Sequence, residues 1–99
     1  MAFSVTVVEG SSPTTVALSG DLDVQTAPLL LDEVAAACEP QSPLLLDCSG
    51  LSFIDSSGVG AVVALRKRCE AAGGSLRLVE VPGRIEFVLT VAGLDSLLL

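Results

Sequence analysis

The feature that most constrains the fold is a regular alternation between short apolar segments and segments with helical periodicity. Residues 44–46 are three consecutive leucines, a run typical of a central strand covered on both faces. Before this run, apolar residues within 30–38 recur at helical spacing, and after it the same holds for residues 62–72. Strands that alternate with helices predict parallel strand pairs joined by right-handed crossovers. The sequence therefore predicts an α/β fold.

The N-terminal quarter of the chain has the pattern of a hairpin. Phe3, Val5 and Val7 alternate with polar or outward positions, which predicts a strand. A turn cluster separates them from residues 14–18, which predict a second strand. Residues 19–21 contain serine and glycine, so we expect the second strand to end there.

Three helices are predicted by their start and stop signals. Thr26 offers an N-cap for the first, and Gly73 follows the last turn of the second. Pro82 opens the third, which ends at Gly93. We expect the order β β α β α β α β, a mixed β-sheet with helices packed against it. The other predicted segments are a loop at 47–50, a fourth strand at 76–79 and a last strand at 97–99.

Length and composition limit the chain to one domain with an aliphatic core. We expect residues 1–99 to form a single domain. Hydrophobic residues make up 51% of the chain but aromatic residues only 3%, so the core must consist of Leu, Val, Ile and Ala. A net charge of -7 argues against nucleic-acid binding and against docking on anionic membranes. No apolar run is long enough to span a membrane and no signal peptide is evident, which predicts a cytoplasmic protein.

The sequence lacks the residues of the common catalytic systems. It has no histidine, which removes the usual base of nucleophilic triads and the commonest metal ligand. The single lysine, Lys67, does not belong to a phosphate-binding loop. Asp21, Asp23, Asp47 and Asp55 are more simply explained as helix caps and solvated loop residues than as an acid–base pair. We therefore expect no enzyme activity, no cofactor and no metal.

The three cysteines do not form a recognisable framework. Cys38, Cys48 and Cys69 are odd in number and lack a CxxC spacing, which argues against structural disulfides and zinc. We expect buried thiols that act as small hydrophobic groups. A redox-sensing pair is the alternative that the sequence leaves open.

The segment from Asp55 to Gly58 is the most informative for function. Asp and Ser are the favoured residues at helix N-caps, so a purely structural role explains the cluster. A hydroxyl at a helix N-terminus also lies beside exposed amides and the positive end of the helix dipole, where a phosphate is tolerated. Phosphorylation there would change the surface without unfolding the domain.

The helix that follows predicts a docking surface. At about 100° per residue, Val62, Leu65, Cys69 and Ala72 fall on one side, which we expect to face the core. Ser56, Val59, Val63 and Lys67 fall on the opposite side. Two valines one turn apart on an otherwise polar face, beside a candidate phosphoserine, predict a docking strip.

Three motifs carry a resemblance to a known family. Residues 46–60, with Asp55-Ser56-Ser57-Gly58-Val59-Gly60 at their end, resemble the signature of STAS domains of the anti-sigma factor antagonist family. Residues 20–23 resemble the family's G-x-[LV]-D before the first helix, and residues 93–95 match after the third. The similarity extends from about residue 3 to residue 97.

This resemblance implies a fold and a mechanism. In the family, the first serine of DS[ST]G, here Ser56, is phosphorylated by a partner kinase that is also the anti-sigma factor. The unphosphorylated domain binds that anti-sigma factor and frees the sigma factor, and a phosphatase resets the cycle. Asp23 matches an acidic residue of the partner-facing loop. The residues expected to bind the partner are Asp23, Asp55, Ser56, Ser57, Gly58, Val59, Val63 and Lys67.

Two other functions remain open at the level of the sequence. The same fold and docking helix would serve as a STAS subunit of a lipid-transport ABC complex or a stress-signalling scaffold, without an obligatory phosphorylation cycle. Some relatives also bind nucleotides, so weak nucleotide binding at the helix N-terminus is a third hypothesis. No nucleic-acid or membrane partner is expected.

Overall fold

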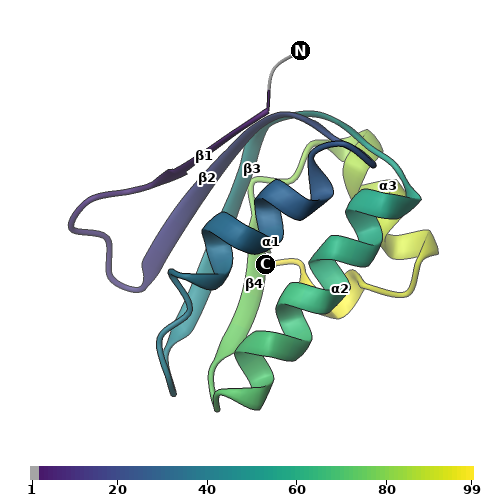
Figure 1. Cartoon of the computed structure of the whole chain (residues 1–99). Coiled ribbons are helices and arrows are strands. Elements are labelled where there is room, and N and C mark those ends of the chain that lie inside the picture. Colours follow the sequence, from purple (N-terminus) through teal and green to yellow (C-terminus); the bar gives the residue numbers. More distant parts are fainter. Residues whose placement is uncertain (1–2) are drawn as a thin grey trace.

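The computed structural model describes residues 3–99, and its elements follow the predicted order (Figure 1). Each of the three predicted helices and the first four predicted strands is present. The elements are β1 (Ser4–Val7), β2 (Thr14–Leu22), α1 (Ala27–Ala35), β3 (Pro43–Ile54), α2 (Ser56–Ala71), β4 (Ser75–Val79), α3 (Gly83–Val91) and a 3-10 helix (Asp95–Leu97). The α/β fold class is thereby confirmed.

The four strands form one mixed sheet in the order β1-β2-β3-β4. β1 and β2 pair antiparallel, as the predicted hairpin requires, whereas β2–β3 and β3–β4 pair parallel. α1 connects the first parallel pair and α2 the second, and the two helices pack against each other (Figure 1). Because both parallel steps move in the same direction along the sheet, right-handed crossovers place both helices on one face.

β2 and β3 are longer than the sequence predicts. Residues 19–21 continue β2 to Leu22, and the predicted loop at 47–50 is part of β3. The pairing of these strands shifts register between Ala17 and Ser19 and again after Gly20. Gly50 has a role there, because a Cβ on it would lie 2.8 Å from the carbonyl oxygen of Leu18. The glycine and serine residues therefore mark irregular pairing inside continuous strands, not their ends.

The predicted last strand is reduced to a single contact. Residues 95–97 form the 3-10 helix, after which Leu98 makes one parallel bridge to Leu78 of β4. The backbone amide of Leu99 donates to the carbonyl of Leu78 at 3.0 Å. Leu97 itself is buried, so this segment is held by packing as much as by strand pairing.

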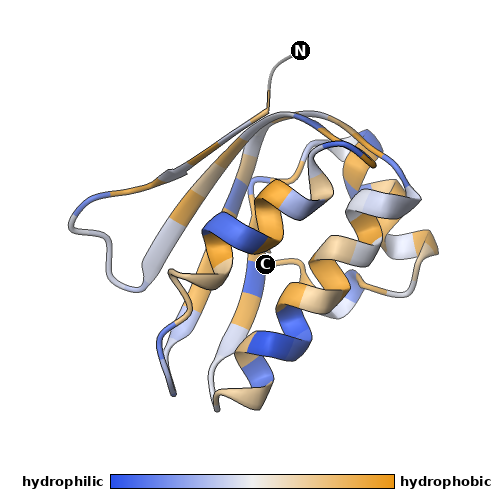
Figure 2. Ribbon diagram, viewed as in Figure 1, coloured by the Kyte–Doolittle hydropathy of each residue, from blue (hydrophilic) through white to orange (hydrophobic). Residues whose placement is uncertain are grey.

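The core lies between the sheet and the helical layer and is aliphatic, as predicted. Buried side chains alternate along β2 and β3, and Leu44 and Leu46 are almost fully enclosed. Leu45 is only half-buried, so β3 is not covered equally on both faces as its leucine run suggested. Hydrophobic and hydrophilic residues alternate along α1 and α2 (Figure 2). No polar or charged residue among 3–99 is classed as buried.

Candidate functional site

The candidate site lies where β2 and β3 end beside each other. Leu22, the last residue of β2, pairs with Ile54, the last of β3. The backbone amide of Asp55 donates to the carbonyl of Leu22 at 3.2 Å, which fixes this junction. Since Asp23 and Asp55 directly follow the two strands, both carboxylates emerge at the same edge of the sheet, where α1 and α2 begin. We call residues 21–26 and 52–60 the carboxyl edge.

Asp55 caps α2, as predicted. It has an extended backbone conformation, and its carboxylate accepts a hydrogen bond from the amide of Gly58 at 3.0 Å. The amide of Val59 donates to the carbonyl of Asp55 at 2.9 Å and starts the helical ladder. This side-chain cap satisfies an amide that would otherwise lack a helical partner, which explains why an aspartate precedes the serines.

Gly58, the third residue of α2, is buried in the first turn of the helix. A Cβ at this position would lie 2.6 Å from the carbonyl oxygen of Leu22 and 2.8 Å from Cγ1 of Ile54. Only glycine therefore allows the helix to begin this close to the end of β2. The contact of Gly58 with a partner stays a prediction, but close packing is sufficient reason for the residue.

Ser56 is the first residue of α2 and its side chain is exposed. Within residues 3–99 its hydroxyl has no hydrogen-bond partner. Ser57, the next residue, is half-buried. Of the two serines, Ser56 is thus the one that a modifying enzyme or a partner would reach more easily.

Asp23 organises the loop between β2 and α1. Its Oδ1 accepts from the amide of Gln25 at 3.0 Å and from the amide of Thr26 at 3.2 Å. In return, the amide of Asp23 donates to the Thr26 hydroxyl at 2.9 Å. Thr26 is the N-cap residue by position, as predicted, but its side chain does not cap α1. The D-x-x-T spacing would have indicated this reciprocal arrangement, because it is a variant of the capping box.

The predicted strip of outward-facing valines requires correction. Val59 and Val63 are half-buried and pack against the core cluster. The core face itself is as predicted, with Val62, Leu65 and Cys69 buried. The exposed positions in line with Ser56 are Gly60, Ala64 and Lys67. This face of α2 therefore carries two small side chains and a lysine instead of an apolar strip, and we call it the small-residue face. Lys67 is exposed, but eleven residues of helix place it about 16 Å from Ser56.

The exposed apolar groups at the carboxyl edge lie elsewhere. Val24, next to Asp23, is 68% exposed, and Phe53, two residues before Asp55, is 50% exposed. Phe53 also lines a hollow of about 190 Å³ together with Ile85 and Val88 of α3. Neither residue was predicted from the sequence as a contact. An aromatic side chain beside a strand end, in a chain with three phenylalanines, would have indicated Phe53.

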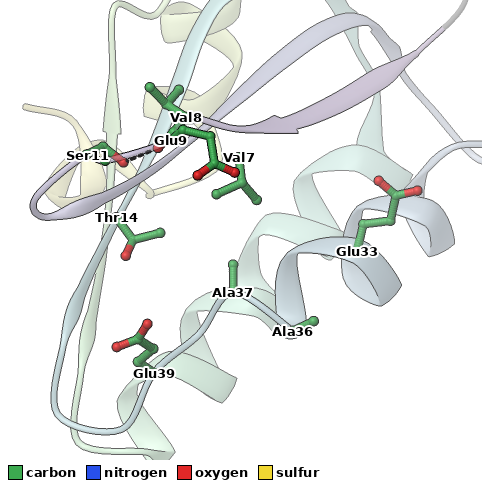
Figure 3. Close-up of a pocket in the computed structure, with 10 residues that line it drawn as sticks. Val7, Val8, Glu9, Ser11, Thr14, Glu33, Ala36, Ala37 and Glu39 are labelled. Carbon is green, nitrogen blue, oxygen red and sulfur yellow. Dashed lines mark hydrogen bonds between the residues drawn. The ribbon is translucent and has the colours of Figure 1, made fainter.

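A larger hollow of about 360 Å³ lies at the opposite end of the molecule, between the β1–β2 turn and the end of α1 (Figure 3). Its rim carries Glu9, Glu33 and Glu39, and the Ser11 hydroxyl there donates to the carbonyl of Val8 at 2.6 Å. No group of three metal-ligating side chains occurs among the described residues. The described helices include none with both the length and the apolar character of a membrane span. The residues that line the larger hollow are all separate from those of the carboxyl edge.

Comparisons with known proteins agree with this geometry. A family model described as "Mlab, STAS domain" matches residues 5–99. The anti-sigma-B factor antagonist of Bacillus subtilis (strain 168) is 28% identical over 98 residues, covering 99% of this chain and 90% of that protein. The structure of the anti-sigma factor antagonist SpoIIAA in its unphosphorylated form superimposes with a TM-score of 0.76 at 26% identity, covering 99% of this chain and 86% of that one. The phosphorylated form of the Bacillus cell fate determinant SpoIIAA gives a TM-score of 0.69 at 25% identity, covering 99% and 89%.

Proposed function

This chain belongs to the STAS domain family, and on that premise we propose that it is an anti-sigma factor antagonist whose binding is switched by phosphorylation of Ser56. In this proposal the unphosphorylated chain binds an anti-sigma factor and so frees a sigma factor. The anti-sigma factor is a serine kinase, and a phosphatase restores the unphosphorylated state. The chain acts by binding and carries out no catalysis of its own.

The observation that carries the proposal is the exposure of Ser56 at the first residue of α2. A relative of the same fold has been solved in unphosphorylated and phosphorylated forms, which supports a modification that leaves the fold intact. The positive end of the α2 dipole favours a phosphate by about 0.3–1 kcal/mol, so the modified chain stays folded. The cap on Gly58 uses the Asp55 side chain and does not require the Ser56 hydroxyl.

The switch follows from charge and desolvation. A phosphoserine adds about -1.5 to -2 charges at neutral pH. Ser56 directly follows Asp55, and the strand pairing brings Asp23 and the exposed Val24 and Phe53 to the same carboxyl edge. A partner that covers these apolar side chains must also remove water from the phosphate, at a cost of about 3–4 kcal/mol. That cost weakens binding about a hundred- to a thousandfold.

The contact surface in this proposal consists of the carboxyl edge and the small-residue face of α2. The residues that we propose to contact the partner include all those expected from the sequence, namely Asp23, Asp55, Ser56, Ser57, Gly58, Val59, Val63 and Lys67. Two exposed apolar residues, Val24 and Phe53, are added to them. The half-buried valines act through the part of their surface that remains open. The small residues Gly60 and Ala64 allow a partner to approach the backbone of α2 closely.

The comparisons do not favour the other functions that the sequence left open. The curated relative and the SpoIIAA structure are anti-sigma factor antagonists, which favours that function over a subunit of a lipid-transport complex or scaffold. We propose a cytoplasmic location, since a sigma factor acts there, and no membrane or nucleic-acid partner. Weak nucleotide binding at the α2 N-terminus remains a separate hypothesis, which calorimetry with ATP and GTP would test.

Phosphorylation is tested by incubating the chain with its anti-sigma factor and ATP and measuring the intact mass. We expect a gain of one phosphate, about 80 Da, which is absent from Ser56→Ala. Ser57→Ala serves as the matched control, because it retains Ser56 and should still be modified. A phosphate that persists in Ser56→Ala would contradict the assignment of the site.

Binding is tested by titrating the same partner with charge variants. Ser56→Asp should bind at least tenfold more weakly than the wild type, and Ser56→Ala should bind as tightly. Ser12→Asp is the control, since Ser12 is exposed in the β1–β2 turn at the opposite end of the sheet. Equal affinities of Ser56→Asp and the wild type for the anti-sigma factor would contradict the proposal.

A further inference from the structure

Two cysteines that are far apart in the sequence meet at the end of the helical layer remote from Ser56. Cys38 lies in the connection that follows α1, and Cys69 lies near the C-terminal end of α2. Their Sγ atoms are 3.0 Å apart, and both are free thiols. Cys48, the third cysteine, is buried in β3 and its Sγ contacts the carbonyl of Leu46 instead. Of the three thiols, the packing of α1 against α2 thus brings only Cys38 and Cys69 together.

The two thiols of this pair have different surroundings. Cys69 is 3% exposed, whereas Cys38 is half-buried and reaches the surface. Burial, followed by the hydrogen bond with Cys38, raises the pKa of the Cys69 thiol to about 12. Because the thiolate is the reactive form and needs access to an oxidant, Cys38 is the sulfur that reacts first. Cys69 is positioned behind it as the second sulfur.

We propose that Cys38 and Cys69 are a modification site at which a hydroperoxide forms a reversible disulfide between the α1–β3 connection and α2. In the first step the Cys38 sulfur attacks hydrogen peroxide, an S–O bond forms and the O–O bond breaks. The departing hydroxide takes the thiol proton of Cys38 and leaves as water, so that Cys38 becomes a sulfenic acid. In the second step the Cys69 sulfur attacks the sulfenic sulfur, an S–S bond forms and the S–O bond breaks. The departing hydroxide takes the thiol proton of Cys69 and leaves as the second water. Two thiols and one peroxide give one disulfide and two waters, and a dithiol reductant reverses the change.

The geometry requires little rearrangement. A disulfide has an S–S distance near 2.05 Å, so the two sulfurs must approach by about 1 Å. Cys38 follows the end of α1 at Ala35 and is not held in a helix or strand, so its connection can supply this movement. Cys69 is thirteen helical residues from Ser56, about 20 Å away, so the bond forms independently of the proposed phosphorylation.

The first experiment treats the reduced wild-type chain with a small excess of hydrogen peroxide. We expect the intact mass to fall by about 2 Da and the number of free thiols to drop from three to one, with both changes reversed by dithiothreitol. Peptide mapping under non-reducing conditions should recover residues 38 and 69 in one cross-linked peptide pair. A melting temperature about 10 °C higher in the oxidised chain is expected, because the bond closes a loop of some thirty residues.

Single variants separate the roles of the two sulfurs. Cys69→Ser should stop at a sulfenic acid on Cys38, seen as a gain of about 16 Da that dimedone captures. Cys38→Ser should lose the fast reaction, whereas Cys48→Ala should still form the disulfide. Retention of three thiols in the wild type, a bond that includes Cys48, or an intermolecular dimer as the main product would each overturn the proposal. The wild-type mapping decides the matter even if a variant fails to fold.

Discussion

The two ends of α2 are both fixed by close backbone contacts, but the reactive side chain that the helix carries is exposed at one end and buried at the other. At the N-terminal end, Asp55 caps the helix and Gly58 lies against the carbonyl of Leu22. At the C-terminal end, the chain leaves through Gly73 with a φ of +81°, and Gly74 packs against the carbonyl of Ser42. The first end exposes Ser56 and has carboxylates around it. The second places Cys69 inside the helical layer.

Under the two proposals above, one helix would carry two kinds of reversible chemistry. A phosphate at the exposed end would change what the surface binds and leave the interior as it is. A disulfide at the packed end would make the helical layer more rigid and leave the binding surface as it is. We therefore expect the two ends to respond separately to substitution.

The largest effect is expected from Gly58→Ala at the N-terminal end. The new Cβ would meet backbone and buried side chains that cannot move aside easily, so we expect a loss of about 3 kcal/mol in the free energy of unfolding. Urea titration followed by circular dichroism measures it. A loss below about 0.5 kcal/mol would mean that the helix start does not lie this close to β2.

Alkaline pH should lower the free energy of unfolding, because two thiols are buried in the folded chain. Burial, and then the charge of Asp47, raise the pKa of the Cys48 thiol from 9.0 to about 12. The unfolded chain then loses this proton above pH 9 while the folded chain retains it, so stability is full below pH 9 and falls as the pH rises toward 12. We expect a loss of about 1.4 kcal/mol per pH unit from Cys48 in this window.

The raised pKa of Cys69 acts in the same direction. Stability curves measured from pH 8 to 10.5 should therefore be steepest for the wild type and shallower for Cys69→Ala. Ser56→Ala serves as the control from the other end of α2 and should keep the wild-type slope. Stability that does not change between pH 8 and 10.5 would contradict the enclosure of both thiols.

Capping should matter more at the N-terminal end of α2 than charge does at its C-terminal end. Asp55→Ala removes the acceptor for the Gly58 amide and should cost about 1 kcal/mol of stability. Arg68→Ala removes the basic residue of the last turn and should cost about 0.3 kcal/mol. Thermal unfolding of the two variants compares these costs, and the reverse order would show that the cap is not formed.

An effect of opposite sign, smaller than that of Gly58→Ala, is expected for Gly60→Ala. Nothing lies within 4 Å of a Cβ at this exposed helical position, so alanine should stabilise the chain by about 0.5–1 kcal/mol. It is the matched control for Gly58→Ala, because the two glycines are two residues apart in one helix. A destabilising Gly60→Ala would indicate that this face of α2 is covered in the folded chain.

Features that depend on neighbouring residues in the sequence were predictable. The start of α2 at Asp55, the stop at Gly73 and the antiparallel hairpin all follow from caps, glycines and alternation within a few residues. The continuity of β2 and β3 was not predictable in this way. A serine followed by a glycine, as at residues 19–20 and 49–50, occurs both in loops and in irregularly paired strands. Only the position of the partner strand distinguishes a loop from a strand at these residues.

Features that depend on packing between distant elements could not be predicted. A helical projection of α2 alone puts Val59 and Val63 opposite the core, but neighbouring elements cover part of the flank of the helix and half-bury both. The contact between Cys38 and Cys69 likewise arises only when α1 packs against α2. The exposure of Ser56 was correctly predicted, because it follows from the position of the residue at the start of the helix.

The most direct test of the account is a hydrogen–deuterium exchange map of the chain with and without its anti-sigma factor. Slower exchange should appear in residues 21–26 and 52–60 when the partner binds, and residues 68–74 at the other end of α2 should be unchanged. The protection should be lost when Ser56 carries a phosphate. Protection confined to residues 68–74, or protection at the carboxyl edge that persists after phosphorylation, would contradict the claim that the exposed end of α2 is the switched surface.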